Sequence, residues 1–360
     1  MEASQMPLPA QPSPETGVLY LGIDLGTSRT SVSASNGVRV TVPSFVGYPK
    51  DVVARKLLKK DVLFGDEALE KRLSLNLYRP LAEGVIKSSL ESGKSNQIEA
   101  EANMRAARDL IAEIVRQARP RADELVYAVI GVPAQASINN KEAILEAAKE
   151  CVDSAMLCSE PFSVAYGLDM LDDVLVIDIG AGTVDLCRMH GTMPEDADQV
   201  TMTTAGDFVD DNLERLIGER YPEAQVTRQM VKTMKERFGS INDNMDPCVV
   251  TMPVAGKPTQ FDIKEEIKEA CAAIVPPIVS GLQQLIATFD PEFQDKLKKR
   301  VLLAGGGSQI KGLDTAIERE MVERLGSGKV IRTEEPMYGG SNGALKIAND
   351  MPDEYWEQLR

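Results

Sequence analysis

The sequence of 360 residues contains a single histidine, His190, and only 5% aromatic residues. One histidine excludes a metal site built from several imidazoles. The five cysteines show no CxxC spacing and their number is odd, which favours reduced, mostly buried thiols in a cytoplasm. The pattern GxxxxGK[ST] is missing, which excludes a P-loop site. No apolar run has the length that we expect of a membrane span.

Positive charge is also scarce, because 40 Lys and Arg residues stand against 55 Asp and Glu residues, a net charge of −15. This balance argues against binding to nucleic acid, which needs clustered positive charge. It also predicts that copies of the chain repel one another, less so in salt. Residues 1–17 hold four prolines and no apolar run, so we expect a disordered tail and no signal peptide.

A short repeat is the strongest internal signal. Apolar strand residues run into Asp24-Leu25-Gly26 and again into Asp178-Ile179-Gly180, and small or hydroxyl residues follow in both places. Both copies predict a β-hairpin with a glycine-containing turn. The two aspartates are 154 residues apart, about the length of a domain, which indicates two related halves.

Strand and helix patterns alternate along the rest of the chain, which indicates an α/β protein. Apolar segments at 125–130 and 300–304 predict strands, and helical periodicity covers residues 98–118, 141–151, 211–218 and 264–287. We expect a disordered tail (1–17), a first lobe (18–165, with a small inserted subdomain at about 45–95), a second lobe (166–335, with an insert at about 207–262) and a C-terminal helix returning to the first lobe (336–360). A hairpin at 249–261 should form an edge, because Pro253 lies within it.

The two Asp-x-Gly turns suggest a phosphate site. Glycine lets backbone N–H groups approach a phosphate closely, and two such turns that face each other can clamp it from both sides. Asp24 and Asp178 would then lie near one site, where a Mg²⁺ ion held through water relieves their repulsion. Each turn taken alone is equally well explained as an ordinary tight turn.

The segment Gly305-Gly306-Gly307-Ser308, after a predicted buried strand, is a third candidate element. Three glycines cost backbone entropy unless a ligand approaches closely, although a flexible loop or a helix entry would also explain them. A flat base edge or a phosphate fits this segment.

These residues resemble the actin/Hsp70/sugar-kinase superfamily of ATPases, whose five nucleotide-pocket motifs occur here in order. Residues 21–30 resemble the first phosphate loop and 176–185 the second, while 303–308 resemble the adenosine motif. Residues 130–134 with 159–167, and 339–344, are similar to the two connections between lobes. The resemblance implies an actin/Hsp70-like ATPase fold, with two similar lobes and a nucleotide cleft between them.

Within this superfamily the chain is most similar to bacterial actins. Residues 79–86 resemble a segment of the rod-shape actins, whereas residues 46–58 and 351–359 resemble the actins that align magnetosomes. The resemblance implies an ATPase that uses ATP, ADP and Mg²⁺, stacks head to tail with copies of itself into cytoplasmic filaments, and reaches the magnetosome membrane through adaptor proteins. Direct insertion into a membrane is not expected, because the N-terminal tail is rich in proline and the C-terminus is acidic.

The same resemblance implies roles for individual residues. Glu160 matches the glutamate that orients the attacking water, although it could be only a salt-bridge residue beside Pro161. Asp178 would hold the water shell of Mg²⁺, with Asp24 on the opposite wall. The nucleotide-binding residues would be Asp24, Gly26, Thr27, Ser28, Gly180, Ala181, Gly182, Thr183, Lys235, Gly305, Gly306, Gly307 and Ser308.

One helix departs from the family pattern. Lys235 matches the lysine that covers the nucleoside, but the upstream position expected to carry an acid for the ribose hydroxyls reads Lys232-Thr233. Glu236 could substitute for it, or ribose recognition could be weaker, and a solvated charged face is the alternative for this helix.

Three other functions stay open at this stage. A rod-shape actin that organises the cell cytoskeleton is the first, and a membrane-bound variant lacks a basic amphipathic segment. A chaperone of the Hsp70 type needs a peptide-binding domain after the ATPase, yet the sequence ends soon after Gly343. A small-molecule kinase needs a second substrate pocket, and nothing beyond Glu160 marks one.

Overall fold

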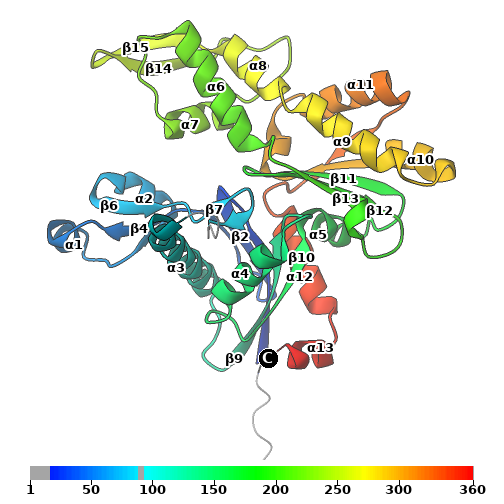
Figure 1. Cartoon of the computed structure of the whole chain (residues 1–360), viewed down its shortest axis with the longest axis horizontal. Coiled ribbons are helices and arrows are strands. Elements are labelled where there is room, and N and C mark those ends of the chain that lie inside the picture. The colour runs from blue at the N-terminus through cyan, green and yellow to red at the C-terminus, as the bar shows by residue number, and fades with distance from the viewer. Residues whose placement is uncertain (1–16, 88–92, 360) are drawn as a thin grey trace, which may run out of the picture.

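Two five-stranded sheets form the framework of the chain in a computed structural model that describes residues 17–87 and 93–359 (Figure 1). The expected N-terminal tail lies outside the described residues except for Gly17. The first sheet, which defines lobe I, has the order β10 (Ser154–Ser159), β9 (Glu124–Val132), β1 (Gly17–Leu25), β2 (Arg29–Ala34) and β3 (Arg39–Pro43). The second sheet, which defines lobe II, has the order β17 (Val330–Arg332), β16 (Val301–Ala304), β11 (Val174–Ile179), β12 (Val184–Met189) and β13 (Gln199–Met202).

The two sheets have the same topology. In each sheet, three strands that follow one another in the chain pair antiparallel. On its other side, the first of these three strands pairs with a parallel strand, and that strand pairs with a second parallel strand. The two predicted hairpins are therefore confirmed as β1–β2 and β11–β12. Asp24 lies opposite Ser31 in one hairpin, and Asp178 lies opposite Asp185 in the other.

Helices cover both faces of the sheets and link the lobes. Their bounds are α1 (Val52–Leu58), α2 (Gly65–Glu70), α3 (Gly93–Gln117), α4 (Ile138–Ala148), α5 (Glu160–Gly167), α6 (Gly206–Arg220), α7 (Arg228–Phe238), α8 (Lys264–Ala272), α9 (Val275–Ala287), α10 (Pro291–Lys298), α11 (Leu313–Leu325), α12 (Gly339–Asp350) and α13 (Asp353–Gln358). Short 3-10 turns span η1 (Arg72–Ser74), η2 (Asp196–Asp198) and η3 (Gly306–Gln309).

Successive side chains along the central strands point to opposite faces of each sheet and pack into three apolar cores. On β9, Val126 and Ala128 point into the core under α3 and α4, whereas Tyr127 and Val129 point to the opposite face. That opposite face shares one core with α5, α12 and residues of β11 and β16, including Val176. Because successive strand residues face opposite sides, each sheet packs on an outer helix layer and on the shared layer between the lobes.

Small separate sheets complete each lobe. In lobe I they are β4 (Val46–Pro49), β5 (Leu63–Phe64), β6 (Leu75–Tyr78), β7 (Leu81–Ala82) and β8 (Val85–Ile86), and in lobe II they are β14 (Val249–Val254) and β15 (Lys257–Asp262). The hairpin β14–β15 confirms the prediction for residues 249–261. Ala255 and Gly256 turn it with positive φ values of 47° and 78°.

The four helix predictions differ from the structure in their bounds: α3 begins at Gly93 and not at 98, and α4 spans Ile138–Ala148 and not 141–151. Helix α6 begins at Gly206, five residues before the predicted start, because the carbonyls of Gly180 and Ala181 accept its first free N–H groups, from Gly206 and Asp207. The predicted single helix 264–287 is divided into α8 and α9. Pro276 and Pro277 lie in the first turn of α9, where their missing N–H groups are tolerated.

The segment 264–287 also corrects the expectation about apolar runs. Its length, and the mean hydropathy of 1.5 over an 18-residue window within it, are those of a candidate membrane span. In the structure, however, 56% of that window is buried inside the chain, and its apolar residues, among them Ile267, Ile278 and Leu282, belong to the core of lobe II. Core packing explains this apolar composition.

The expectation of unpaired thiols is confirmed, since all five cysteines are free.

The C-terminal segment packs back onto lobe I. Helix α12 lies against β1, β9 and α5, and Trp356 of α13 is fully buried. The Trp356 ring stacks on Tyr127 with 5.1 Å between ring centroids and 17° between ring planes.

Replacing Trp356 with alanine should therefore destabilise lobe I. We expect Trp356→Ala to lower the free energy of unfolding by about 3–5 kcal/mol, since the truncation leaves a cavity. Thermal unfolding followed by circular dichroism measures the change. Tyr355→Ala is the matched control, because Tyr355 is 56% exposed and its loss should change the unfolding free energy by less than about 0.5 kcal/mol. Equal melting temperatures for the two variants would contradict this packing role.

Candidate functional site

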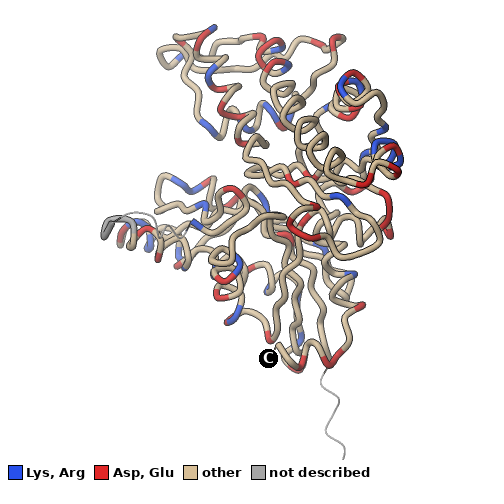
Figure 2. Tube along the Cα trace, turned by 45° about the vertical axis from the view of Figure 1, so that its right-hand side comes forward, with Lys and Arg blue, Asp and Glu red and all other residues tan. Residues whose placement is uncertain are grey.

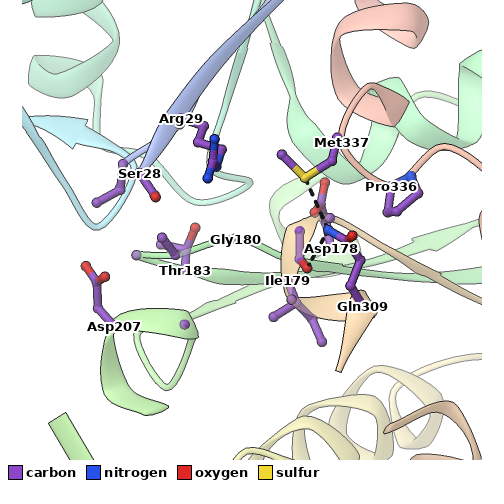
Figure 3. A pocket seen from close by; sticks show the side chains of 18 of the residues that line it. Ser28, Arg29, Asp178, Ile179, Gly180, Thr183, Asp207, Gln309, Pro336 and Met337 are labelled. Carbon is purple, nitrogen blue, oxygen red and sulfur yellow. Dashed lines mark hydrogen bonds between the residues drawn. The ribbon is translucent and has the colours of Figure 1, made fainter. Parts of the chain in front are cut away.

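A cavity of about 390 Å³ lies between the two lobes (Figure 3). Lobe I contributes the turn after β1 and the first residue of α5. Lobe II contributes the turn after β11, the first two turns of α6, α7 and the glycine segment after β16. In Figure 3, Ser28 and Arg29 of lobe I lie across the cavity from Thr183 and Asp207 of lobe II.

Fourteen of the fifteen predicted site residues line this cavity. They are Asp24, Gly26, Thr27, Ser28, Glu160, Asp178, Gly180, Ala181, Gly182, Thr183, Lys235, Gly305, Gly306 and Gly307. The exception is Ser308. Its side chain is fully buried, and its hydroxyl donates a 2.7 Å hydrogen bond to the carbonyl of Gly305. Ser308 therefore holds the glycine segment in shape and does not face the cavity.

Parallel pairing of strands brings Asp24 and Glu160 together. Asp24 pairs with Gly131 of β9, whose neighbour β10 ends one residue before Glu160. The carboxyl ends of parallel strands meet at one edge of a sheet, which is where ligands bind in α/β folds. A Cβ atom added to Gly131 would lie 3.3 Å from Glu160 Cγ, a tight contact that places the Glu160 side chain directly beside this edge of the sheet.

Two glycines allow close approaches that a side chain would block. A Cβ at Gly182 would meet Thr27 Oγ1 at 2.5 Å and Glu83 N at 2.7 Å, so the two turns touch across the lobes at this residue. Gly305 has a φ of 77°, and a Cβ there would meet Asp178 Oδ1 at 2.2 Å. Both positions need glycine in order to bring the three loops around one space.

Buried carboxyl groups dominate the electrostatics of the cavity. Burial raises the pKa of Asp24 to about 6, and it raises the pKa values of Asp178 and Glu160 well above their ordinary ranges, with further upward contributions from Asp24. Within residues 17–87 and 93–359, no Lys or Arg forms an ion pair with any of these three carboxyls. Their ionised forms are therefore disfavoured in this site, and a bound cation would favour them again.

A fourth acid, Asp185, serves a different purpose. Its Oδ1 accepts hydrogen bonds from the backbone N–H of Ala134 at 2.8 Å and from Thr201 Oγ1 at 2.5 Å. Ala134 follows β9 in lobe I, so Asp185 ties the second hairpin to the opposite lobe. Burial raises the pKa of Asp185, while its hydrogen bonds with Thr201, Thr183 and Ala134 act in the opposite direction.

Lys235 reaches the cavity from α7 and is anchored on α6. Its ammonium lies 2.8 Å from Asp210 Oδ1 and donates to the carbonyl of Gly206 at 2.7 Å. Burial raises the pKa of Asp210, although Lys235 opposes that effect. The pair fixes the two helices beside the second turn. Because the paired side chains of Lys235 and Asp210 are largely buried, α7 does not present a fully solvated charged face, which is the alternative given above for this helix.

Sequence reasoning missed several residues that line the cavity. Asp207 and Asp210 were overlooked because the helix was predicted to begin only at 211, and the Gly206-Asp207 pair just before it was the available signal. Gln309, which donates to the carbonyl of Gly306 at 3.2 Å and contacts Met337 Sδ at 3.3 Å, carries no motif. These residues become neighbours only through the fold.

The site has room for a phosphate chain and a cation, and the cation would have few direct protein ligands. Among the residues that the structure describes, no group of three or more His, Cys, Asp or Glu side chains is arranged to bind a metal ion directly. The carboxyls of Asp24 and Asp178 suit a hydrated cation, which is the form that Mg²⁺ prefers. The backbone N–H groups of the two glycine turns suit phosphate oxygens.

Comparison with known proteins gives consistent matches over nearly the whole chain. The profile of the MreB/Mbl protein family matches residues 19–354. The actin-like protein MamK of Paramagnetospirillum magneticum is 40% identical over 341 residues, which cover 95% of each chain. Among solved structures, a MamK double helical filament matches with a TM-score of 0.87, 39% identity and coverage of 93% of this chain and 100% of that one. A non-polymerising MamK mutant bound to AMPPNP matches with a TM-score of 0.69 at the same identity and coverage.

Removing the charge of Asp24 should stabilise the ligand-free protein. The pKa of Asp24 rises from 3.8 to about 6 on folding, so its protonated form favours the folded state and that contribution is lost as the pH rises through 6. At pH 7.5 we expect Asp24→Asn to raise the unfolding free energy by up to about 3 kcal/mol, and the gain should shrink as the pH falls below 6.

Thermal unfolding across a pH series without ligand tests this expectation. Asp61→Asn is the matched control, because the Asp61 side chain is 86% exposed and forms a loose 3.4 Å pair with Arg55. Surface pairs of this kind contribute little to stability. A lower melting temperature for Asp24→Asn at pH 7.5, or a gain that does not change with pH, would contradict the proposed charge burial.

Proposed function

Because the chain belongs to the MreB/Mbl family of actin-like proteins, as its motifs predict, we propose that it is an ATPase that polymerises into cytoplasmic filaments and positions magnetosomes. The observation that carries this proposal is the cavity between two lobes of equal topology, lined by both glycine turns and by unpaired carboxyls. The similarity to MamK over 95% of the chain supports the filament and the magnetosome role. A rod-shape function is the runner-up, because the family profile also includes MreB.

The residues of the cavity suit ATP and Mg²⁺. Gly26, Thr27, Ser28 and the segment from Gly180 to Thr183 would donate to the phosphates, and the glycines from 305 to 307 would lie against the adenosine. Asp24 and Asp178 would hold the hydrated Mg²⁺, which neutralises phosphate charge when it is bound. Their carboxyls have no cation partner in the described residues, and this is the condition that a bound Mg²⁺ would satisfy.

Glu160 would orient the water that attacks the γ-phosphate. The bond from the γ-phosphorus to the β–γ bridging oxygen breaks, and ADP and inorganic phosphate are the products. Phosphoryl transfer needs mainly positioning and charge neutralisation, so a carboxyl that accepts a hydrogen bond from water is sufficient. The first residue of α5 is fixed by the strand before it and by the core around Phe162 and Val164, which makes Glu160 a rigid support.

Filament formation would follow from closure of the lobes around the nucleotide. The contact between Gly182 and Thr27 joins the lobes at the phosphate loops, so a bound triphosphate favours one relative position of the lobes. Head-to-tail stacking of that form is a heterologous contact and gives an open filament. Adaptor proteins would connect the filament to the magnetosome membrane. A small-molecule kinase would need a second substrate site, and the described residues that line this cavity give no separate indication of one.

Assembly should depend on nucleotide and on ionic strength. Acidic residues occur along the backbone of both lobes (Figure 2), and the net charge of −15 opposes stacking of identical subunits. We expect more protein in the pellet with ATP and Mg²⁺ than with ADP. We also expect more at roughly 0.1 M salt, where the Debye length is about 10 Å, than at roughly 0.01 M salt, where it is about 30 Å. Sedimentation across a salt series measures this. Protein that stays in the supernatant under every condition would disprove the filament proposal.

A second expectation concerns hydrolysis. Glu160→Ala should still polymerise with ATP but should release phosphate at least tenfold more slowly, since a positioned acid–base group typically contributes about 10²–10⁴-fold. Its filaments should then persist after the wild-type filaments have disassembled. Phosphate release and electron microscopy of the same samples provide the two measurements.

Glu142→Ala serves as the matched control, because Glu142 is an exposed acid on α4 outside the cavity. It should hydrolyse ATP and disassemble like the wild type. If the Glu160→Ala filaments disappear as fast as those of the control, Glu160 does not take part in hydrolysis.

A further inference from the structure

Lys232 is a cation that faces the cavity and forms no ion pair with a carboxylate within residues 17–87 and 93–359. It lies on α7 of lobe II, three residues before Lys235, and its side chain lines the cavity. Its ammonium donates a hydrogen bond to Ser28 Oγ, in the first glycine turn of lobe I. The ring of Phe45 lies 6.0 Å from the ammonium. Neither neighbour carries a negative charge.

The other cations around this rim are already paired. Arg29 lies 3.5 Å from Glu236, Arg79 lies 2.9 Å from Asp207, and Lys235 lies 2.8 Å from Asp210. In the described residues, Lys232 forms no ion pair of this kind. Burial lowers the pKa of Lys232, with smaller downward contributions from Arg79, Arg29 and Lys235, whereas Glu236 raises it. A partly buried ammonium among like charges needs an anion.

The contact with Ser28 indicates where this anion binds. The Ser28 hydroxyl and the backbone N–H groups of its turn are the proposed donors to phosphate, and Lys232 approaches them from the opposite lobe. An ammonium group has three donors and no acceptor, so it matches anionic oxygens better than ribose hydroxyls or a base edge.

We infer that Lys232 binds the phosphate chain of the nucleotide beside Ser28, and that it links α7 of lobe II to the first phosphate loop when a nucleotide is bound. This inference rests on the proposed function, because it needs a nucleotide in the cavity. It makes nucleotide affinity depend on the number of phosphates. It also assigns a role to the position at which the family pattern led us to expect an acid.

Competition binding against a fluorescent ATP analogue tests the inference, with unlabelled ATP, ADP and adenosine as the competitors. The variant Lys232→Met removes the charge and keeps the length of the side chain. We expect it to weaken ATP about tenfold, ADP less, and adenosine by less than about twofold, since only the charged interaction is lost. Lys232→Arg should keep ATP affinity within about threefold of the wild type.

Arg237→Met is the matched control, because Arg237 is an exposed cation on the same helix outside the cavity. It should bind all three ligands like the wild type. Wild-type affinity of Lys232→Met for ATP would overturn the inference, and so would an equal loss for ATP and adenosine, which indicates a structural or sugar-binding role. Failure of the wild type itself to bind ATP would overturn the proposed function as well.

Discussion

Three carboxyls that meet in the cleft without a cation partner are the constraint on which this structure depends. Asp178 is buried, Asp24 and Glu160 are partly exposed to the cavity, and no cation in the described chain pairs with any of them. Enclosing such groups without a cation costs folding energy, and groups of this kind are concentrated at functional sites. The proposed Mg²⁺ would offset this cost by favouring the ionised carboxylates.

The fold places this charge by repeating one arrangement twice. Each lobe presents the carboxyl end of its first central strand to the cleft, and the shared helix layer of α5 and α12 holds the two sheets together below it. Since the lobes also meet at Gly182 and Thr27, a ligand in the cavity contacts both lobes at once. Binding energy can thereby be converted into a relative position of the lobes, which is what a nucleotide-dependent polymer needs.

The cations at the rim give the site a second level of control. Ion pairs of Arg79 with Asp207 and of Arg29 with Glu236 cross from one lobe to the other, whereas Lys235 and Asp210 join two helices within lobe II. Lys232 also reaches across the cleft to Ser28, and among the described residues it forms no ion pair with an acid. The overall geometry superimposes more closely on a MamK filament than on a non-polymerising mutant, with TM-scores of 0.87 and 0.69.

Local sequence determined the two hairpins and the strands at β9 and β16, because Asp-x-Gly turns and apolar runs carry their structural preference within a few residues. Fourteen of the fifteen residues predicted for the site line one cavity. The misplaced start of α6 shows the limit. Carbonyls of the turn at Gly180 cap that helix, and such a partner cannot be read from the helix itself.

Only the tertiary structure decided which residues share the cavity and which charges remain unpaired. Ser308 belongs to a matching motif yet faces inward, while Asp207 and Gln309 belong to no motif yet line the site. Lys232 and Ser28 are 204 residues apart in the chain and meet across the cleft. Pairing and burial of charge depend on distances in space, and those distances are set by the packing of two lobes against one layer of helices.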